Sequence, residues 1–237
     1  MTSPGTDAAA LGAIIARTRW LLLDFDGPIC SIYAGLPAPT VADRLRKLFT
    51  DPLPDEIANT PDPIEVFCYS ATVSDEMAAR IEAEMADLEV AAVATAEPTP
   101  YVHEVIGSAH QSGRTVGVVS NNSLRAVNSY LERRGLIEGV ELVAARISRD
   151  PALLKPNPHL INEALRGLHA DTAATVLVGD SFTDIEASHH AAVESIGYAN
   201  KPGKRDRMAQ LNAGAIISSM ADLVLSMRAY SLNKNST

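Results

Sequence analysis

The sequence has few cysteines and no long hydrophobic run. Its 237 residues include two cysteines, Cys30 and Cys68, which form no C-x-x-C pair and indicate no disulfide framework. We expect both to be reduced and to pack as small hydrophobic residues. No window approaches the roughly 18 apolar residues of a membrane span, and residues 1–20 lack the basic start and apolar stretch of a signal peptide. These absences predict a cytoplasmic protein without a membrane partner.

Basic residues are also scarce relative to acidic ones. The chain has 20 Lys and Arg against 29 Asp and Glu, which gives a formal net charge of −9. This balance argues against nucleic acid or an anionic membrane as the main partner. A hydrophobic share of 46% and a charged share of 21% are close to the averages of globular proteins. The length fits one domain, or one domain with a modest insert.

Six short apolar runs predict the strands of a buried sheet. They are bounded by turn residues, and most are separated by segments of helical length. Because the runs are apolar throughout, they fit strands that are covered on both faces. Alternation of strand and helix predicts an α/β fold with a parallel, doubly wound sheet. The runs cover residues 20–25, 115–120, 140–145, 174–179, 195–199 and 215–218.

The interval between Cys30 and Pro98 interrupts this alternation, because it contains helical patterns and no convincing strand. Residues 40–49 place apolar side chains on one helical face, and a longer helical pattern opens at Ser74. A turn-rich segment, 51–65, joins the two. An insert directly after the first strand lies over the carboxyl end of that strand, where ligands bind in open α/β sheets.

This organisation predicts three parts. They are a loose tail over 1–10, a catalytic α/β core over 11–30 and 99–237, and an all-helical cap domain over 31–98.

Four aspartates lie where predicted strands end. Asp24 and Asp26 follow the first strand, and Gly27 then allows a tight turn. Residues i and i+2 share a face, so the two carboxylates raise each other's pKa unless a positive charge lies nearby. Asp180 and Asp184 follow the fourth strand; helix capping would explain Asp184 alone. Convergence of the two clusters at one sheet edge predicts a hard-cation site, which suits magnesium better than zinc because Cys and His are absent.

Two further segments carry groups that bind anions. Ser120 and Asn121 end a strand just before a helix, where a hydroxyl and free backbone N–H groups form a phosphate cradle. Ordinary helix capping explains these two residues equally well when they are taken alone. Lys155 precedes a proline, which favours an extended backbone, although a lone lysine is usually solvated. Together with the aspartates, these groups predict phosphoryl transfer to a carboxylate nucleophile.

In this order the four segments, DFDGP, VVSNN, LLKPNP and GDSFTD, resemble the signature motifs of the haloacid dehalogenase-like (HAD) hydrolase superfamily. The helical insert is similar to the C1 cap of phosphoglycolate phosphatase-like members. The resemblance implies a Rossmann-like core and a magnesium-dependent phosphatase that hydrolyses a small phosphate monoester through an aspartyl-phosphate intermediate. Two residues depart from the family pattern: Pro28 stands where Thr or Val is usual, and Asn122 stands where phosphoglycolate phosphatases commonly have Lys.

The resemblance also implies a role for each motif residue. Asp24 would be the nucleophile, and Asp26 would protonate the leaving group and then activate water. Ser120 would bind the phosphoryl group, and Lys155 would hold it beside Asp24. Gly27 and Asn121 would line the phosphate site. Magnesium would be bound by Asp24, the backbone carbonyl of Asp26, Asp180 and Asp184.

Basic residues of the predicted helix over 40–49 have two interpretations. Arg46 and Lys47 lie three and four residues after Asp43, so they fit a solvated helix face paired with that carboxylate. The alternative is that they bind a second anionic group of the substrate.

Other functions are compatible with the same motifs. A phosphomutase would pass the phosphoryl group to a sugar hydroxyl, and a phosphonatase would need Lys47 for a Schiff base. A regulatory module would bind a phosphorylated ligand without turnover. A haloalkanoate dehalogenase is disfavoured by the carboxylate of Asp26. The expected partner is a small phosphorylated metabolite, and the sequence leaves its identity and the oligomeric state open.

Overall fold

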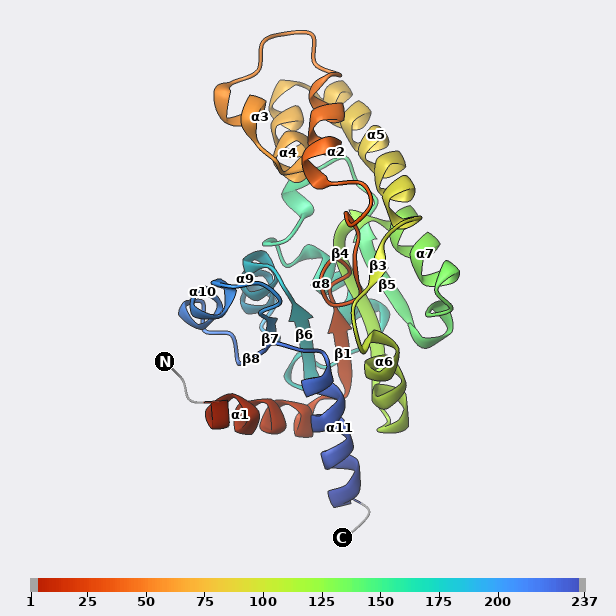
Figure 1. Ribbon diagram of the computed structural model, residues 1–237, viewed down its shortest axis with the longest axis vertical. Coiled ribbons are helices and arrows are strands. Elements are labelled where there is room, and N and C mark those ends of the chain that lie inside the picture. Colours follow the sequence, from red (N-terminus) through yellow and green to blue (C-terminus); the bar gives the residue numbers. More distant parts are fainter. Residues whose placement is uncertain (1–3, 235–237) are drawn as a thin grey trace.

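The computed structural model describes residues 4–234, which form a six-stranded sheet flanked by helices (Figure 1). The strand order is β5-β4-β1-β6-β7-β8, and every neighbouring pair is parallel. The doubly wound parallel α/β fold is therefore confirmed. The strands are β1 (Trp20–Leu23), β4 (Thr115–Ser123), β5 (Leu142–Arg146), β6 (Thr175–Gly179), β7 (Glu194–Tyr198) and β8 (Ala215–Ile217).

Side chains of the sheet alternate between two hydrophobic clusters, one on each face. Leu21 and Leu23 pack against α1 (Pro4–Arg17), α6 (Val102–Gln111), α7 (Leu124–Arg133) and α11 (Ala221–Lys234). Leu22 points the other way, against α8 (His159–Gly167) and α9 (Phe182–His190). A shorter helix, α10 (Lys204–Gln210), packs on α9 and β8. Burial on both faces explains why the strands are apolar throughout.

The segment after β1 forms a helical layer that stands over the carboxyl edge of the sheet (Figure 1). It enters and leaves through a short antiparallel pair, β2 (Cys30–Ser31) with β3 (Glu97–Pro98). The helices are α2 (Ala38–Arg46), α3 (Asp55–Asn59), α4 (Pro63–Val73) and α5 (Asp75–Val93). They enclose a hydrophobic cluster of their own, which includes Val41, Phe67 and Ile81. In the figure, α5 is the helix that runs from this layer down to the sheet.

Three details differ from the sequence predictions. A helix, α1, occupies most of the predicted tail, because Leu11, Ile14 and Ile15 are buried against the sheet; residues 1–3 lie outside the described residues. The segment predicted to be turn-rich contains α3 and the start of α4. Cys30 is buried as predicted, whereas Cys68 is exposed.

None of the helices in the described part of the chain is both long and apolar enough to span a bilayer.

Candidate active site

The sheet topology brings the predicted motifs together. β1 lies between β4 and β6, and Leu23 is in register with Val118 on one side and Val178 on the other. The residues that follow these positions therefore reach the same edge. Asp24 follows β1, Ser120 lies on β4, and Asp180 directly follows β6.

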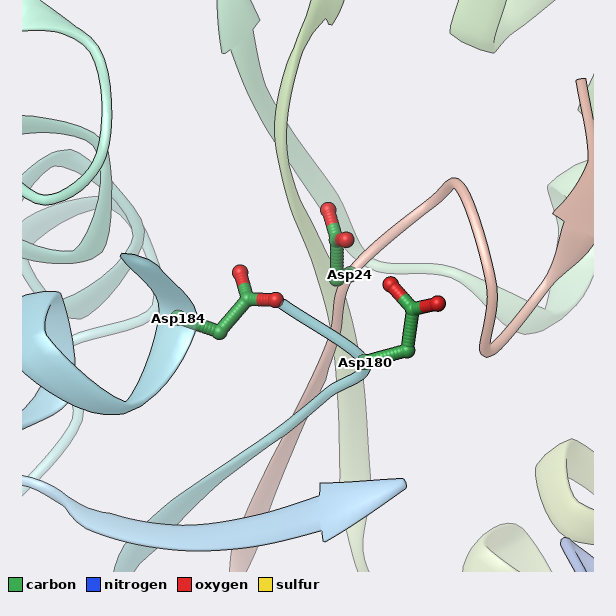
Figure 2. A group of neighbouring side chains, drawn as sticks. All are labelled: Asp24, Asp180 and Asp184. Carbon is green, nitrogen blue, oxygen red and sulfur yellow. The ribbon is translucent and has the colours of Figure 1, made fainter. Parts of the chain in front are cut away.

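Three carboxylates gather at this edge (Figure 2). Ligand oxygens of Asp24, Asp180 and Asp184 lie within 4.8 Å of one another. Asp24 and Asp184 are buried, and Asp180 is half-buried. The donors are all carboxylate oxygens, which fit a hard divalent cation such as Mg²⁺. Asp184 also caps α9, because its Oδ2 accepts the amide N–H of Ser181 at 2.9 Å. Capping and cation binding are thus compatible at this residue.

Lys155 provides the positive charge of the cluster. Its Nζ donates to Asp24 Oδ1 at 2.7 Å, to Asp184 Oδ1 at 2.5 Å and to the Val119 carbonyl at 3.2 Å. Burial raises the pKa of Asp24 well above its usual value, the charge of Asp184 adds to the rise, and Lys155 opposes it. Burial alone would lower the pKa of Lys155, but Asp184 and Asp24 outweigh it and raise that pKa. The lysine is therefore a fixed cation beside Asp24.

Asp26 has a separate environment from Asp24. Its Oδ1 accepts the amide N–H of Ile32 at 3.1 Å. Burial raises its pKa to about 6, although the Ile32 hydrogen bond opposes the rise. A carboxyl group with a pKa in this range can both give and take a proton near neutral pH.

Gly27 allows two strand-end loops to touch. It has a φ of 107°, and a Cβ placed on it would lie 2.4 Å from Asp180 Cγ. Gly113 also has a positive φ, of 75°, but has nothing within 4 Å of such a Cβ.

The different surroundings of Gly27 and Gly113 predict that alanine destabilises the protein more at Gly27. We expect Gly27→Ala to lower the free energy of unfolding by about 1–3 kcal/mol more than Gly113→Ala, because only Gly27 adds a steric clash to the backbone strain. Urea denaturation of both variants measures the difference. Equal losses would show that the contact with Asp180 relaxes freely.

Asp180 is held by two residues that the sequence analysis missed. Lys204 Nζ donates to its backbone carbonyl at 2.7 Å and to its Oδ2 at 2.6 Å. Asn200 Nδ2 donates to the same Oδ2 at 2.8 Å. Both residues follow β7 in segments without a recognisable motif, so only the fold reveals the contact.

The end of β4 supports Lys155. The amide of Asn121 donates to the Lys155 carbonyl at 3.1 Å and accepts its N–H at 2.9 Å. Ser120 is fully buried, and its hydroxyl donates to Asn122 Oδ1 at 3.2 Å. Asn121 thus lines the cavity beside Lys155, whereas Ser120 does not line it, and the contact of either residue with phosphate stays a prediction.

A buried ion pair, which the sequence did not predict, connects residues 121–123 to the helical layer. Glu89 of α5 is fully buried and accepts from Arg146 Nη1 and Nη2 at 3.1 and 2.9 Å. The same carboxylate accepts from Asn122 Nδ2 at 3.1 Å and from the Ser123 amide at 2.8 Å. Arg146 Nη1 also donates to the Asn121 carbonyl at 2.8 Å. Glu89 and Arg146 therefore hold the backbone on both sides of Asn122.

Arg46 and Lys47 do not join the cluster. Arg46 pairs with Asp43 and donates to the Thr60 carbonyl at 2.5 Å, so its guanidinium group fastens α2 to the segment after α3. Neither Arg46 nor Lys47 lines the cavity above the carboxylates. The pairing of Arg46 with Asp43 agrees with the first of the two interpretations of these residues, and contact of Arg46 or Lys47 with a substrate stays a prediction.

A cavity of about 490 Å³ opens above the carboxylates. Its sheet-side wall includes Asp24, Asp26, Lys155, Asp180 and Asp184, and residues of the helical insert form the opposite wall. The arrangement places the carboxyl groups of Asp24 and Asp26 and the fixed cation of Lys155 at one open cavity.

Comparisons with known proteins agree with this arrangement. A family model described as haloacid dehalogenase-like hydrolase matches residues 39–198, more than half of the chain. Asp24 and Asp26 lie before the matched range, so their place in the site rests on the geometry above.

Two curated relatives are phosphatases by name. Pyrophosphatase PpaX of Halalkalibacterium halodurans is 28% identical over 130 residues, which are 54% of this chain and 59% of that protein. Phosphoglycolate phosphatase of Vibrio parahaemolyticus is 25% identical over 126 residues, which are 53% of this chain and 54% of that protein. The chain thus spans less than two thirds of the length of these relatives.

Solved structures share the fold at lower identity. A predicted phosphatase from Clostridium acetobutylicum superposes with a TM-score of 0.72 at 15% identity, and the match covers 90% of this chain and 99% of that one.

Proposed function

The chain belongs to the haloacid dehalogenase-like hydrolase family, and we propose that it is a magnesium-dependent phosphatase of small phosphate monoesters that works through an aspartyl-phosphate intermediate. One observation carries the proposal. Asp24, the predicted nucleophile, lies 2.7 Å from the ammonium group of Lys155 and within 4.8 Å of two carboxylates that complete a hard-cation site. The names of the two curated phosphatases support the same reaction class.

The first half-reaction forms a bond between Asp24 and phosphorus. A carboxylate oxygen of Asp24 attacks the phosphoryl group, and the bond from phosphorus to the ester oxygen breaks. Asp26 donates its proton to that oxygen, so the alcohol leaves neutral. Its pKa of about 6 supports this role, because a protonated fraction exists near neutral pH.

The second half-reaction returns Asp24 to its starting state. Asp26, now a carboxylate, takes a proton from a water molecule as that water attacks the phosphorus atom. Inorganic phosphate leaves, and Asp24 is again a carboxylate. Lys155 stays beside both states and offsets the negative charge of the transferring group.

Asp24, Asp180 and Asp184, together with the backbone carbonyl of Asp26, would hold the cation. When bound, Mg²⁺ supplies positive charge that orients and neutralises the phosphoryl oxygens. In this proposal residues 31–98 act as a cap, which encloses the leaving group and limits the entry of water.

The direct test is phosphate release by the purified protein. We expect hydrolysis of p-nitrophenyl phosphate with Mg²⁺, loss of that activity with EDTA, and binding of beryllium fluoride only when Mg²⁺ is present. Beryllium fluoride binding, followed by ¹⁹F NMR, reports on the site independently of turnover. Absence of both hydrolysis and binding would contradict the proposal.

Phosphate release also separates the alternatives. A phosphomutase would need a bisphosphate activator and would release little free phosphate from a panel of phosphorylated metabolites. The phosphonatase alternative loses support because Lys47, its required lysine, is exposed and does not line the cavity.

A cytoplasmic location stays part of the proposal and is testable by fractionation.

A further inference from the structure

The insert-side wall of the cavity faces the place where the leaving group would lie. Three prolines, Ala38, Ile64, Tyr33 and Asp62 form this wall. Under the proposed function, the sheet-side wall holds the phosphoryl group. The rest of the substrate therefore extends toward the insert, and the chemistry of this wall selects among leaving groups.

Asp62 is the only charged residue of the insert-side wall. Within the part of the chain that the structure describes, it forms no ion pair. Lys155 is the only cation among the residues that line the cavity, and its Nζ already binds Asp24 and Asp184. The insert therefore presents a carboxylate to the leaving group without a counterion.

The position of Asp62 is fixed by its backbone. Its Oδ1 accepts the amide N–H of Ile64 at 2.8 Å, which makes Asp62 the N-cap of α4. Pro61 and Pro63 on either side restrict the chain further. Oδ2 has no hydrogen-bond partner among the described residues, so a fixed oxygen is free to accept from a ligand. Such preorganisation lowers the cost of binding a donor.

A helix N-terminus would ordinarily favour an anion, and the N-terminus of α4 lies at this wall. Its donors are largely taken here. Pro63, the first helical residue, has no N–H, and the N–H of Ile64 is bound by Asp62 itself. Glu65 adds a second carboxylate in the same turn. The net charge at this end of α4 is therefore negative.

From these observations we propose that the leaving group carries an ammonium group that pairs with Asp62, so that the substrate is the phosphate ester of an amino alcohol. The inference rests on the proposed phosphatase function. Tyr33, whose hydroxyl has no hydrogen bond among the described residues, offers a second polar contact on the same wall. A carboxylate or second phosphate in the leaving group would face Asp62 and be repelled.

Three substrates of similar size test the proposal. O-phosphoethanolamine carries an ammonium group, propyl phosphate has the same length without charge, and 2-phosphoglycolate carries a carboxylate. We expect kcat/KM with Mg²⁺ to fall in that order, with a difference of at least about tenfold between the first and the last. Equal or better turnover of 2-phosphoglycolate would overturn the inference.

Asp62→Asn is the matching variant, because asparagine keeps the N-cap and removes only the charge. We expect the ratio of kcat/KM for phosphoethanolamine to that for 2-phosphoglycolate to fall about tenfold. Glu65→Gln is the control: Glu65 lies in the same turn of α4, but it accepts from the Thr60 hydroxyl and does not line the cavity, so the ratio should change much less than in Asp62→Asn. A ratio that is the same in wild type and Asp62→Asn would overturn the inference while leaving the phosphatase proposal intact. Failure to hydrolyse any of the three esters, together with absence of p-nitrophenyl phosphate hydrolysis and of beryllium fluoride binding, would overturn both.

Discussion

Replacing Asp24 by asparagine should abolish phosphate release while leaving the protein folded. The amide has nearly the shape of the carboxylate but cannot attack phosphorus. We expect a loss of at least about four orders of magnitude in kcat, the scale on which covalent enzymes lose activity without their nucleophile. Continuous detection of released phosphate measures the rate, and trapping with beryllium fluoride should fail in parallel.

The same variant makes a prediction about stability. Burial and Asp184 raise the pKa of Asp24 in the folded protein despite Lys155. A carboxyl group whose pKa is raised in the folded state opposes folding at any pH above its ordinary pKa, and the loss of stability is complete once the pH exceeds the folded pKa. Asp24→Asn removes this cost, so its thermal midpoint without Mg²⁺ should equal or exceed that of wild type. Residues of an active site often lower the stability of a protein because they are selected for activity.

Asp171→Asn is the control for this experiment. Asp171 is exposed, and its side chain accepts the Ala173 amide at a turn that asparagine can also cap. It should keep both the activity and the thermal midpoint of wild type. If Asp24→Asn retained most of the wild-type rate, the aspartyl-phosphate mechanism would be wrong. A lower midpoint would show that the ionised Asp24 stabilises the fold through Lys155.

Much of the site could be predicted because the carboxyl ends of parallel strands lie at the same edge of a sheet. Apolar runs located the strands, and the residue after each run then identified Asp24 and Asp180. Their closeness follows from β1 and β6 being neighbours, which sequence position alone does not show. Lys155 was noted from its place before a proline and its role was implied by the resemblance, and the structure places its Nζ between Asp24 and Asp184. The positive charge expected near Asp24 and Asp26 is Lys155, which binds Asp24, whereas Asp26 accepts from the Ile32 amide.

The insert was harder to predict, because its local signals are ambiguous. The segment PDPIE has the composition of a turn, yet Asp62 caps a helix whose first residue is Pro63. Aspartate at the N-cap and proline at the first position also start helices, so the same letters fit both structures. Asp62 was therefore overlooked as a residue of the site. The charge of Arg46 suggested a contact with substrate, but its guanidinium group pairs with Asp43 and donates to the Thr60 carbonyl within the insert.

Long-range pairs were beyond prediction for a different reason. Glu89 lies on a helix with many other acids, and Arg146 ends a strand in a segment with no motif. Nothing in either segment distinguishes a buried partner from a solvated charge. Only the packing of α5 against the end of β5 creates the pair.

Because the Glu89–Arg146 pair is fully enclosed, breaking it should have the largest effect on stability of any single change in the insert. Glu89→Ala would leave Arg146 with Glu82 as its one carboxylate partner beside the Asn121 carbonyl, and would remove an acceptor from Asn122 and Ser123. Removing one partner of a buried pair costs about 3–5 kcal/mol, a large part of the roughly 5–15 kcal/mol that stabilises a typical domain. Guanidinium denaturation of wild type and variant measures the loss.

Activity should fall as well, since the pair supports the segment that carries Ser120 and Asn121. We expect kcat/KM to drop by about 10–100-fold at temperatures where the variant is still folded, by analogy with residues that orient the ligands of metal sites. Asp87→Ala is the matched control. It lies two residues earlier on α5 and pairs with Arg125 at 2.8 Å, but both side chains are well exposed. Such a pair contributes about 1 kcal/mol or less, and its loss should leave activity unchanged.

A double variant distinguishes the ion pair from simple packing. Glu89→Leu combined with Arg146→Met replaces two charges by apolar side chains of similar volume, and such replacements of buried pairs are often neutral. The double variant should therefore be more stable than Glu89→Leu alone, because it leaves no unpaired guanidinium group in the interior. If both variants were equally unstable, the stabilisation would come from the bonds of Arg146 to Glu82 and to the Asn121 carbonyl. If Glu89→Ala cost no more than Asp87→Ala, the ion pair would not hold the insert on the sheet, and residues 120–123 would instead be held by the hydrogen bonds between Asn121 and Lys155.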